Sequence, residues 1–322
     1  MKLYPFKFQP ILKERLWGGT KLKEVLGKPI VSDITGESWE LSAVQGDISI
    51  VANGALSGTP LQEIIDQEPE ALLGKEVVRR FGKDFPILIK FIDAKQDLSI
   101  QLHPNDKLAK ERHNSFGKTE MWYVMDADPG ANLIVGFNKN VTKEEYSKSL
   151  ENNSLLDLLN YEQVEEGDTF FINTGKIHAI GAGVLLAEIQ QTSDITYRVF
   201  DFNRKDKNGN LRELHTDLAL DAMDYTKKDD FKVVYDKKSD VVNTMVECPY
   251  FKTNYLNLTQ TLNLDVSKRS SFTILMCVDG SAEISTNTGS VDLKKGETVL
   301  VPANSQNLTI NTRNTKLLEV TV

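Results

Sequence analysis

The feature of this sequence that most restricts its fold is a long succession of short apolar segments separated by glycine, aspartate and asparagine. Stretches such as FPILIKFIDA, EMWYVMDA, VLLAEIQQ and TKLLEVTV are eight or ten residues long and rich in β-branched and aromatic side chains. Segments of this length with turn residues between them are typical of antiparallel sandwiches and barrels. We therefore predict a mainly β protein of the β-barrel or jelly-roll type.

Helical patterns are fewer and fall between the strand-like segments. Thr59-Pro60 opens a stretch with apolar residues at helical spacing, and Thr142 with Glu145 forms a capping box before KEEYSKSL. We predict short helical insertions at about 59–82 and 142–160, and a further helix that begins at Thr216.

Chain length and an internal repeat both indicate two domains. A chain of 322 residues exceeds the usual size of a single core. Aligning Gly167 with Gly296 pairs EGDTFFINTGKIHAI with KGETVLVPANSQNLT, which indicates two copies of one β-unit. We place the boundary in the lysine- and aspartate-rich stretch 225–240, giving domains of residues 1–235 and 240–322. His178 falls opposite Asn307 in this alignment, so the second copy lacks that histidine.

The charge balance and the absence of long apolar runs narrow the range of partners. A net charge of −8 argues against binding to a nucleic acid backbone, although a local group of basic residues can still bind an anionic small molecule. We find no signal peptide and no apolar run of membrane-spanning length, so we expect a cytoplasmic protein without a membrane partner. Cys248 and Cys277 are predicted to be free thiols in a reducing compartment.

The octapeptide SIQLHPND shows a strand with two different faces. Strand alternation places Ser99, Gln101 and His103 on one side, and Ile100 and Leu102 on the other. A sheet with one solvated face gives the same pattern without any function. The polar face indicates a site only if matching residues occur elsewhere in the chain.

Two such residues occur downstream. Glu120 lies between apolar neighbours in KTEMWYVM, where an unpaired carboxylate would be costly to bury, and Lys118 and Trp122 share its face. His178 follows a predicted turn in INTGKIHAI. Histidine, carboxylate and amide groups on strands suit zinc, iron, nickel or copper, so Gln101, His103, Glu120 and His178 are candidate metal ligands. A structural ion pair at Glu120 remains the alternative.

These strings resemble a known protein family. The stretch from Gly167 to His178 is similar to the second sequence motif of the cupin superfamily, and Gln101, His103 and Glu120 match the first motif, with Gln101 in place of its first histidine. Together, LSIQLHPND, GKTEMWYV, NTGKIHAI and EIQQTSDITYRVFDFNR resemble the short bacterial branch of the type I mannose-6-phosphate isomerases, which are zinc-dependent cupins. RLWGG and GESWELS near the N-terminus fit the same family.

The resemblance implies a fold, a reaction and a set of residue roles. The fold would be two cupin-type domains, the second metal-free, and the reaction would be interconversion of mannose 6-phosphate and fructose 6-phosphate through a cis-enediol. One Zn²⁺ per chain would be bound by Gln101, His103, Glu120 and His178. Substrate would be bound by Ser99 and Lys90, which match phosphate-binding positions. The catalytic residues would be Arg198, Lys118, Glu188 and Asp194, with the proton-transfer base unassigned.

Two other functions fit part of the same pattern. A mononuclear metal cupin oxygenase would use a similar ligand set with iron, and a non-catalytic sugar-phosphate-binding cupin would keep the fold without turnover. We expect a monomer or weak homodimer with a hexose 6-phosphate as its small-molecule partner. His113, in the predicted loop KERHNSFGK, and His215, just before a helix, are expected to be surface or capping residues.

Overall fold

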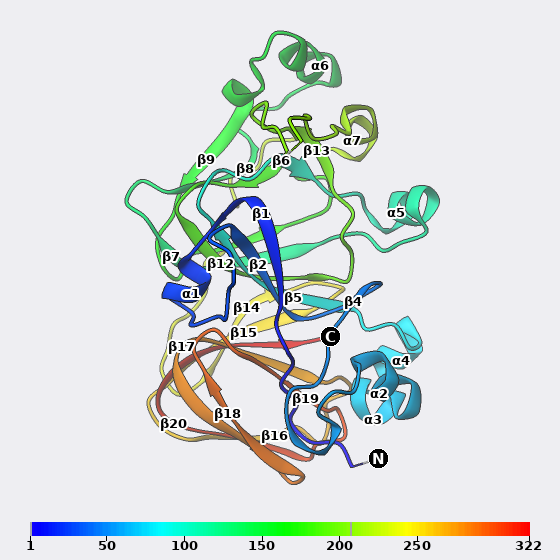
Figure 1. The fold of residues 1–322 in the computed structure, drawn as a ribbon, viewed down its shortest axis with the longest axis vertical. Coiled ribbons are helices and arrows are strands. Elements are labelled where there is room, and N and C mark those ends of the chain that lie inside the picture. Colours follow the sequence, from blue (N-terminus) through cyan, green and yellow to red (C-terminus); the bar gives the residue numbers. More distant parts are fainter. Residues whose placement is uncertain (1, 207) are drawn as a thin grey trace.

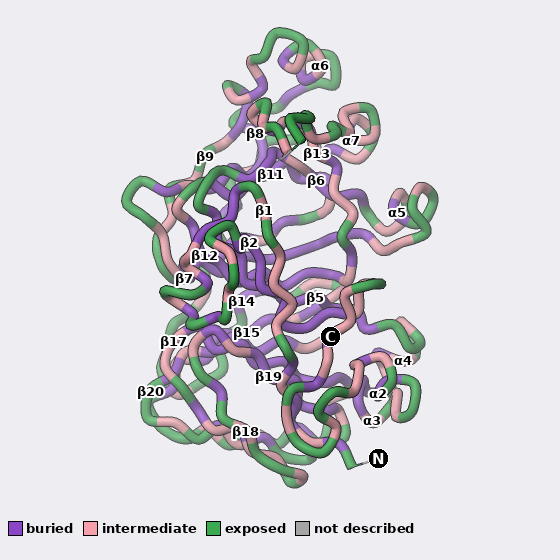
Figure 2. Tube along the Cα trace, in the orientation of Figure 1, coloured by how far each residue is buried: buried purple, intermediate pink, exposed green. Residues whose placement is uncertain are grey.

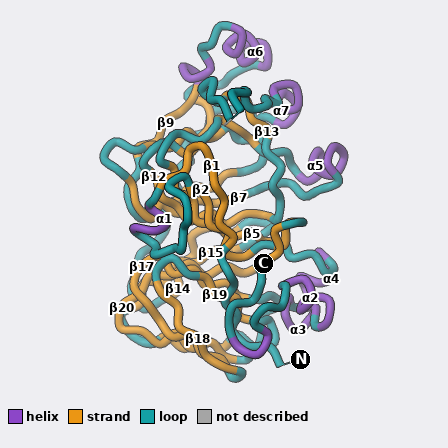
Figure 3. The backbone as a smooth tube through the Cα atoms, in the orientation of Figure 1, coloured by secondary structure: helices purple, strands orange, loops and turns teal. Residues whose placement is uncertain are grey.

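The computed structural model describes residues 2–206 and 208–322, and it is mainly β, as predicted. In Figure 1 the strands that follow residue 240 occupy the lower half of an elongated molecule, and helix α6 lies at its upper end. Figure 3 shows that the strands fill the middle of the molecule and the helices lie at its periphery. No helix in the described ranges is long and apolar enough to cross a membrane.

The first part of the chain forms two main sheets, which are open rather than closed into a barrel. The six-stranded sheet has the order β1-β2-β5-β12-β7-β10, and the five-stranded sheet has the order β13-β6-β11-β8-β9. Their strands are β1 (Ile11–Gly19), β2 (Thr35–Leu41), β5 (Ile87–Ala94), β6 (Ile100–Leu102), β7 (Glu120–Ala127), β8 (Asn132–Phe137), β9 (Leu159–Gln163), β10 (Thr169–Ile172), β11 (His178–Ile180), β12 (Val184–Gln191) and β13 (Tyr197–Phe200). A small hairpin joins β3 (Ala43–Val44) to β4 (Asp47–Ile48).

The last part forms one seven-stranded sheet around two long strands. Its strands are β14 (Val242–Glu247), β15 (Lys252–Leu258), β16 (Leu262–Asp265), β17 (Thr273–Thr286), β18 (Gly289–Lys294), β19 (Thr298–Val301) and β20 (Asn307–Thr321). Strand β20 pairs with β16 near its start and with β15 near its end, so the sheet folds over its own core. Strand β17 is continuous through the turn-like Asp279-Gly280 pair, because a register shift between Cys277 and Asp279 absorbs it.

Helices occur in both predicted insertions and from Thr216, and two further helices, α1 and α5, were missed. The helices are α1 (Lys21–Glu24), α2 (Leu61–Gln67), α3 (Pro69–Leu73), α4 (Lys75–Phe81), α5 (Asp106–His113), α6 (Lys143–Glu151) and α7 (Thr216–Ala222), with short 3-10 turns at Gly54–Leu56 and Leu155–Leu158. KERHNSFGK was predicted to be a loop, which is wrong for its first four residues. They belong to α5, which begins after Asn105. The Asn105 side chain accepts a hydrogen bond from the backbone N–H of Leu108, which caps this largely polar helix.

A shared apolar core joins the two parts of the chain. Alternate residues of β12, such as Leu185 and Ile189, belong to the same buried cluster as Leu318 and Val320 of β20. The N-terminal segment adds to it, because Phe6 pairs with Leu300 of β19. Figure 2 shows the buried backbone concentrated in these central strands. The opposite face of each sheet is therefore left to line the interior of its own domain. The boundary at 235–240 stays a prediction.

The structure places both copies of the predicted repeat in the same local fold. Gly167 and Gly296 have φ values of +88° and +82°, a left-handed conformation that glycine adopts readily. Each glycine is followed two residues later by a four-residue strand, β10 or β19. His178 begins β11 and Asn307 begins β20, so these aligned residues also occupy equivalent positions.

Candidate active site

Three site residues form a row across the five-stranded sheet. Gln101 in β6 pairs with His178 of β11 on one side and with Arg198 of β13 on the other. Ile100 and Leu102 point into an apolar cluster, as the alternation predicted. The polar face of SIQLHPND is therefore turned toward the domain interior rather than toward solvent.

A second row lies on the six-stranded sheet. Glu188 of β12 pairs with Lys90 of β5 and with Trp122 of β7, and Lys90 in turn pairs with Trp39 of β2. The Lys90 Nζ lies 3.0 Å from Glu188 Oε1, and the Trp122 indole N–H donates to Glu188 Oε2 at 2.9 Å. Residues of both rows line one cavity.

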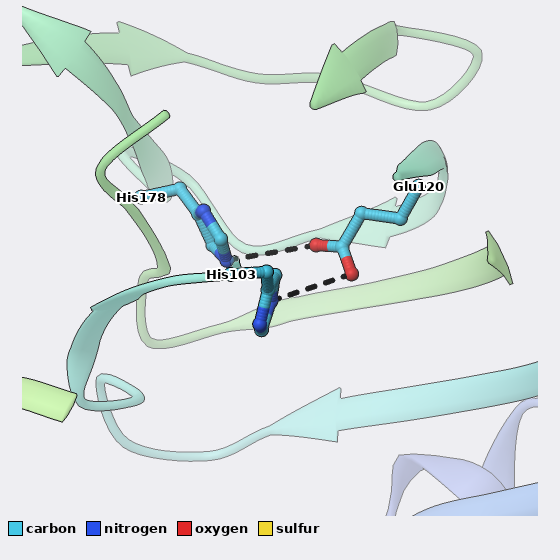
Figure 4. Close-up of side chains that lie close together, drawn as sticks. All are labelled: His103, Glu120 and His178. Atoms are coloured by element: carbon cyan, nitrogen blue, oxygen red, sulfur yellow. Dashed lines mark ion pairs between the residues drawn. The ribbon is translucent and has the colours of Figure 1, made fainter. Parts of the chain in front are cut away.

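His103, Glu120 and His178 form a buried cluster of potential metal ligands. Each is at most 1% exposed, and one ligand atom from each lies within 4.8 Å of the others. The Nε2 atoms of both histidines lie 3.6 Å from the Glu120 carboxylate, one facing each oxygen (Figure 4). Glu120 and His178 stand at the first residues of β7 and β11, and His103 follows β6 directly.

The hydrogen bonds of the two histidines fix which ring nitrogen carries the proton. His103 Nδ1 lies 2.8 Å from the Ile195 carbonyl, and His178 Nδ1 lies 2.8 Å from the Lys176 carbonyl. A carbonyl only accepts, so each Nδ1 is protonated and each Nε2 presents a lone pair toward Glu120. His103 Nε2 and both Glu120 oxygens are buried without a hydrogen-bond partner among the described residues. Several lone pairs converge here, with the Lys118 ammonium 3.3 Å from one carboxylate oxygen, and such an arrangement fits a bound cation.

Gln101 brings a fourth polar group to this cluster. Its amide nitrogen lies 3.5 Å from His178 Nε2, and its amide oxygen accepts from the Ser99 hydroxyl at 3.3 Å. A half-turn of the amide group exchanges its oxygen and its nitrogen. The contact therefore places the amide beside the histidines whichever of the two atoms faces them. The structure thus brings the four predicted metal ligands together.

Burial controls the ionisation of the cluster. Burial raises the pKa of Glu120 to about 7, against the attraction of Lys118, whose Nζ lies 3.3 Å away. Burial also lowers the pKa of His178 to about 4 and that of His103 well below its usual range. Both imidazoles are therefore neutral near pH 7, which is the form that binds a metal.

The pKa of Glu188 is shifted in the opposite direction from that of Glu120, although both side chains are buried. Burial opposes its ionisation, but Lys90 and Lys118 outweigh that effect and lower its pKa to about 2. The same carboxylates act on Lys118, whose pKa is raised by Glu120 and Glu188 despite burial. The cavity wall therefore holds a fixed carboxylate between two ammonium groups.

The cavity has a volume of about 440 Å³, which is in the range of small-molecule sites. All six predicted substrate and catalytic residues line it: Lys90, Ser99, Lys118, Glu188, Asp194 and Arg198. Asp194 is exposed, whereas Arg198 is partly buried and donates to the Glu213 carbonyl at 2.8 Å. Burial and the neighbouring Arg212 lower the pKa of Arg198. The structure thus gathers these six residues around one space.

The residue-by-residue reasoning missed several other residues of the cavity wall, among them Arg15, Glu37, Trp39 and Arg212. Arg15 donates to Glu37 at 2.7 Å, and the Trp39 indole N–H donates to the same carboxylate oxygen at 2.9 Å. Arg15 and Glu37 belong to RLWGG and GESWELS, which were used only for family likeness. The available signal was that both charged residues stand next to apolar residues in the sequence, Arg15 before Leu16 and Glu37 two residues before Trp39.

The two excluded histidines lie outside this cavity. His113 is exposed at the end of α5, with its Nε2 2.9 Å from the Tyr197 hydroxyl. His215 occupies the cap position of α7, but its side chain makes no capping hydrogen bond to that helix.

Comparison with known proteins gives a consistent result along the chain. Residues 5–131 match the model of the type I phosphomannose isomerase catalytic domain, and residues 241–321 match the mannose-6-phosphate isomerase cupin domain. The mannose-6-phosphate isomerase ManA of Bacillus subtilis is 36% identical over 94% of each chain. The mannose-6-phosphate isomerase of Streptococcus mutans is 32% identical over 92% of each chain. A crystal structure of the Bacillus subtilis mannose 6-phosphate isomerase matches 99% of this chain and 100% of its own, with a TM-score of 0.90 and 32% identity.

Proposed function

This chain belongs to the type I phosphomannose isomerase family, and we propose that it interconverts mannose 6-phosphate and fructose 6-phosphate with one Zn²⁺ bound per chain. The observation that carries the proposal is the buried cluster of His103, Glu120 and His178, with Gln101 beside it. Two histidines, a carboxylate and an amide oxygen suit zinc, and the two backbone carbonyls hold the imidazoles in the metal-binding tautomer.

An aldose–ketose isomerisation moves a proton between C1 and C2 through a cis-enediol, so negative charge develops on the sugar oxygens. Bound zinc supplies positive charge next to that developing oxyanion. Arg198 lies in the same strand row as two of the ligands and adds a guanidinium to the cavity wall. Glu188 holds the Lys90 ammonium at 3.0 Å and, with Glu120, raises the pKa of Lys118, which in turn compensates the charge of Glu120.

The substrate phosphate needs cationic and hydroxyl donors, and we assign this role to Ser99 and Lys90. Both line the cavity and both are buried. Because Lys90 already pairs with Glu188 at 3.0 Å, its charge is shared between the carboxylate and the substrate. Lys90→Met should therefore raise KM for mannose 6-phosphate more than it lowers kcat. Asp194 lies exposed on the wall of the same cavity, where a carboxylate can exchange protons with the substrate or solvent.

A coupled assay with mannose 6-phosphate tests the proposal most simply. Activity should disappear after removal of metal with a chelator and return on addition of one equivalent of Zn²⁺. Glucose 6-phosphate and galactose 6-phosphate serve as controls for the substrate. Full turnover in the chelator-treated protein would overturn the zinc assignment. O₂ consumption restored by Fe²⁺, without isomerisation, would favour an oxygenase, and no turnover of any sugar phosphate would favour a binding protein.

Cys248 and Cys277 are not joined in a disulfide, which supports our proposal of a reducing compartment such as the cytoplasm. We also propose that the chain works as a monomer or weak homodimer, because all the assigned site residues come from one chain.

A further inference from the structure

In the second domain a threonine stands where the first domain has its metal-binding carboxylate. Thr273 begins β17 as Glu120 begins β7, and each pairs with the last residue of the repeat strand, β19 or β10. Glu319 of β20 lies between β15 and β17 as Glu188 of β12 lies between β5 and β7, and both glutamates are buried. Arg269 lies 2.7 Å from Glu319 and compensates its charge. The contacts between the two domains are therefore where the second can influence the catalytic cavity.

Tyr250 makes one of these contacts. It lies in the short loop between β14 and β15, where the Arg80 guanidinium of α4 donates to the Pro249 carbonyl. The Tyr250 hydroxyl donates to Asp106 Oδ2 at 2.5 Å. Burial and the Asp106 carboxylate raise the pKa of this hydroxyl, so it stays protonated and remains the donor. A side chain of the second domain is thus bonded to the first residue of α5.

Asp106 also binds the segment that leads into β7. Its other oxygen, Oδ1, accepts from the Gly117 backbone N–H at 2.9 Å and from the Gln191 side-chain amide at 3.1 Å. Gln191 Oε1 in turn accepts from the Thr119 N–H at 2.8 Å. The backbone N–H groups of Gly117 and Thr119 are therefore both held by side chains, and both bonds depend on the position of Asp106.

This segment carries two residues of the catalytic cavity. Lys118 lies between the two bonded N–H groups, and Glu120 follows Thr119 directly. The Lys118 Nζ lies 3.3 Å from Glu120 Oε2, and both side chains are buried. Gly117 packs closely against α5, since an added Cβ would lie 2.7 Å from the Asp106 backbone nitrogen. A shift of residues 117–119 would therefore move a proposed catalytic ammonium and a proposed metal ligand together.

We propose that Tyr250 is a positioning residue: through Asp106, it holds Lys118 and Glu120 in the geometry that the reaction needs. The inference rests on the function proposed above, and it gives the second domain a part in shaping the catalytic cavity. Tyr250 itself is not among the residues that line that cavity. An error of about 1 Å in the placement of a catalytic group can lower a rate about 10²-fold, so a contact that restrains this segment affects kcat.

Amide hydrogen exchange tests the link directly. Tyr250→Phe removes the hydroxyl but keeps the ring. Tyr235→Phe is the matched control, because the Tyr235 hydroxyl donates to the Gly167 carbonyl at 2.7 Å, a contact that does not involve Asp106. Exchange is followed by NMR on the deuterated, zinc-loaded protein. The Gly117 and Thr119 N–H groups should exchange about three- to tenfold faster in Tyr250→Phe, the change expected for the loss of one hydrogen bond, and at the wild-type rate in Tyr235→Phe.

Kinetics of the same variants connect the segment to the reaction. Tyr250→Phe should lower kcat about three- to tenfold and change KM by less than about twofold, because Lys118 is displaced but the substrate-binding groups are not. Asp106→Ala should have a larger effect on exchange and on kcat, because Gly117 and Gln191 lose their acceptor. Asp106→Asn should restore most of both, because its amide oxygen still accepts from Gly117 and its amide nitrogen can donate to the Tyr250 hydroxyl.

Three results would overturn the proposal. Exchange of Gly117 and Thr119 could be unchanged in Tyr250→Phe, exchange could rise while kcat of the zinc-loaded variant equals that of the wild type, or Asp106→Asn could be as impaired as Asp106→Ala. Exchange is measured without substrate. Faster exchange in Tyr250→Phe would therefore support the positioning role even if the wild-type protein failed to turn over mannose 6-phosphate, an outcome that would overturn the proposed function alone.

Discussion

The two domains contain the same β-unit, but they compensate the buried carboxylates in its interior in different ways. In the first domain, the buried ligand atoms of His103, Glu120 and His178 lie close together, and their lone pairs favour a bound metal ion. In the second, the positions equivalent to Glu120 and His178 hold Thr273 and Asn307, and Arg269 supplies the positive charge. The comparison teaches that the strand framework alone does not make a metal site. The side chains at a few register positions do.

The largest expected effect comes from the aligned pair His178 and Asn307. His178→Ala should remove tight zinc binding and lower kcat/KM by about 10³-fold or more, because the metal and its charge are lost together. Asn307→Ala, at the exposed equivalent position, should leave both unchanged. Metal analysis and the coupled assay on the two purified variants check this. Zinc retained at one equivalent in His178→Ala would contradict the ligand assignment.

The second comparison uses the two buried glutamates. Glu188→Gln should lower kcat/KM roughly 10- to 100-fold, because Lys90 and Lys118 lose the carboxylate that holds them. Glu319→Gln should leave catalysis intact but reduce the free energy of unfolding by about 1–3 kcal/mol, because Arg269 loses its charged partner. Kinetics and urea denaturation of both variants measure the two effects. Equal catalytic losses in the two variants would show that the second domain takes part in the reaction.

The third prediction concerns pH and applies only to the metal-binding domain. Because the pKa of Glu120 is raised to about 7, zinc must displace a proton from this carboxylate below that pH. The affinity for Zn²⁺ should therefore fall as pH decreases from about 7 to 5, by up to about tenfold per unit. The pKa of His178, lowered to about 4, keeps that imidazole neutral throughout this range. Competition with a chromophoric chelator measures the slope, and an affinity independent of pH would contradict the account.

The smallest expected effect is a difference in unfolding free energy between substitutions of the two glycines of the repeat. Gly167→Ala should cost about 1 kcal/mol of unfolding free energy, because alanine is disfavoured at φ +88°. Gly296→Ala should cost more, because its added Cβ would lie 2.7 Å from Leu26 Cβ and 2.8 Å from the Leu26 carbonyl oxygen. Denaturant unfolding of the two variants gives the difference. Equal costs would mean that the backbone conformation alone decides the effect.

Much of the fold could be predicted because it depends on local patterns, whereas the residues of the first cavity were predicted partly from strand alternation and partly from the family resemblance. The alternation in SIQLHPND gave the face of Ser99 and Gln101, and the capping box gave α6, where Thr142 accepts from the Glu145 N–H. Helix α5 was missed because it is mostly polar and offers little apolar periodicity.

Features that depend on strand register could not be predicted. Glu319 stands in TKLLEVTV, where the sequence indicates only an apolar strand, and its partner Arg269 lies in a loop between strands. Arg15 and Glu37 are far apart in sequence and meet because β1 pairs with β2. Alternation shows which face a residue takes, but it does not show which residue lies opposite.

The most direct test of the central claim is an anomalous difference map at the zinc edge from crystals of the active enzyme. We predict one peak per chain, between His103, Glu120 and His178, and none beside Arg269 in the second domain. An active enzyme without density at the first position, or with its metal in the second domain, would contradict the account.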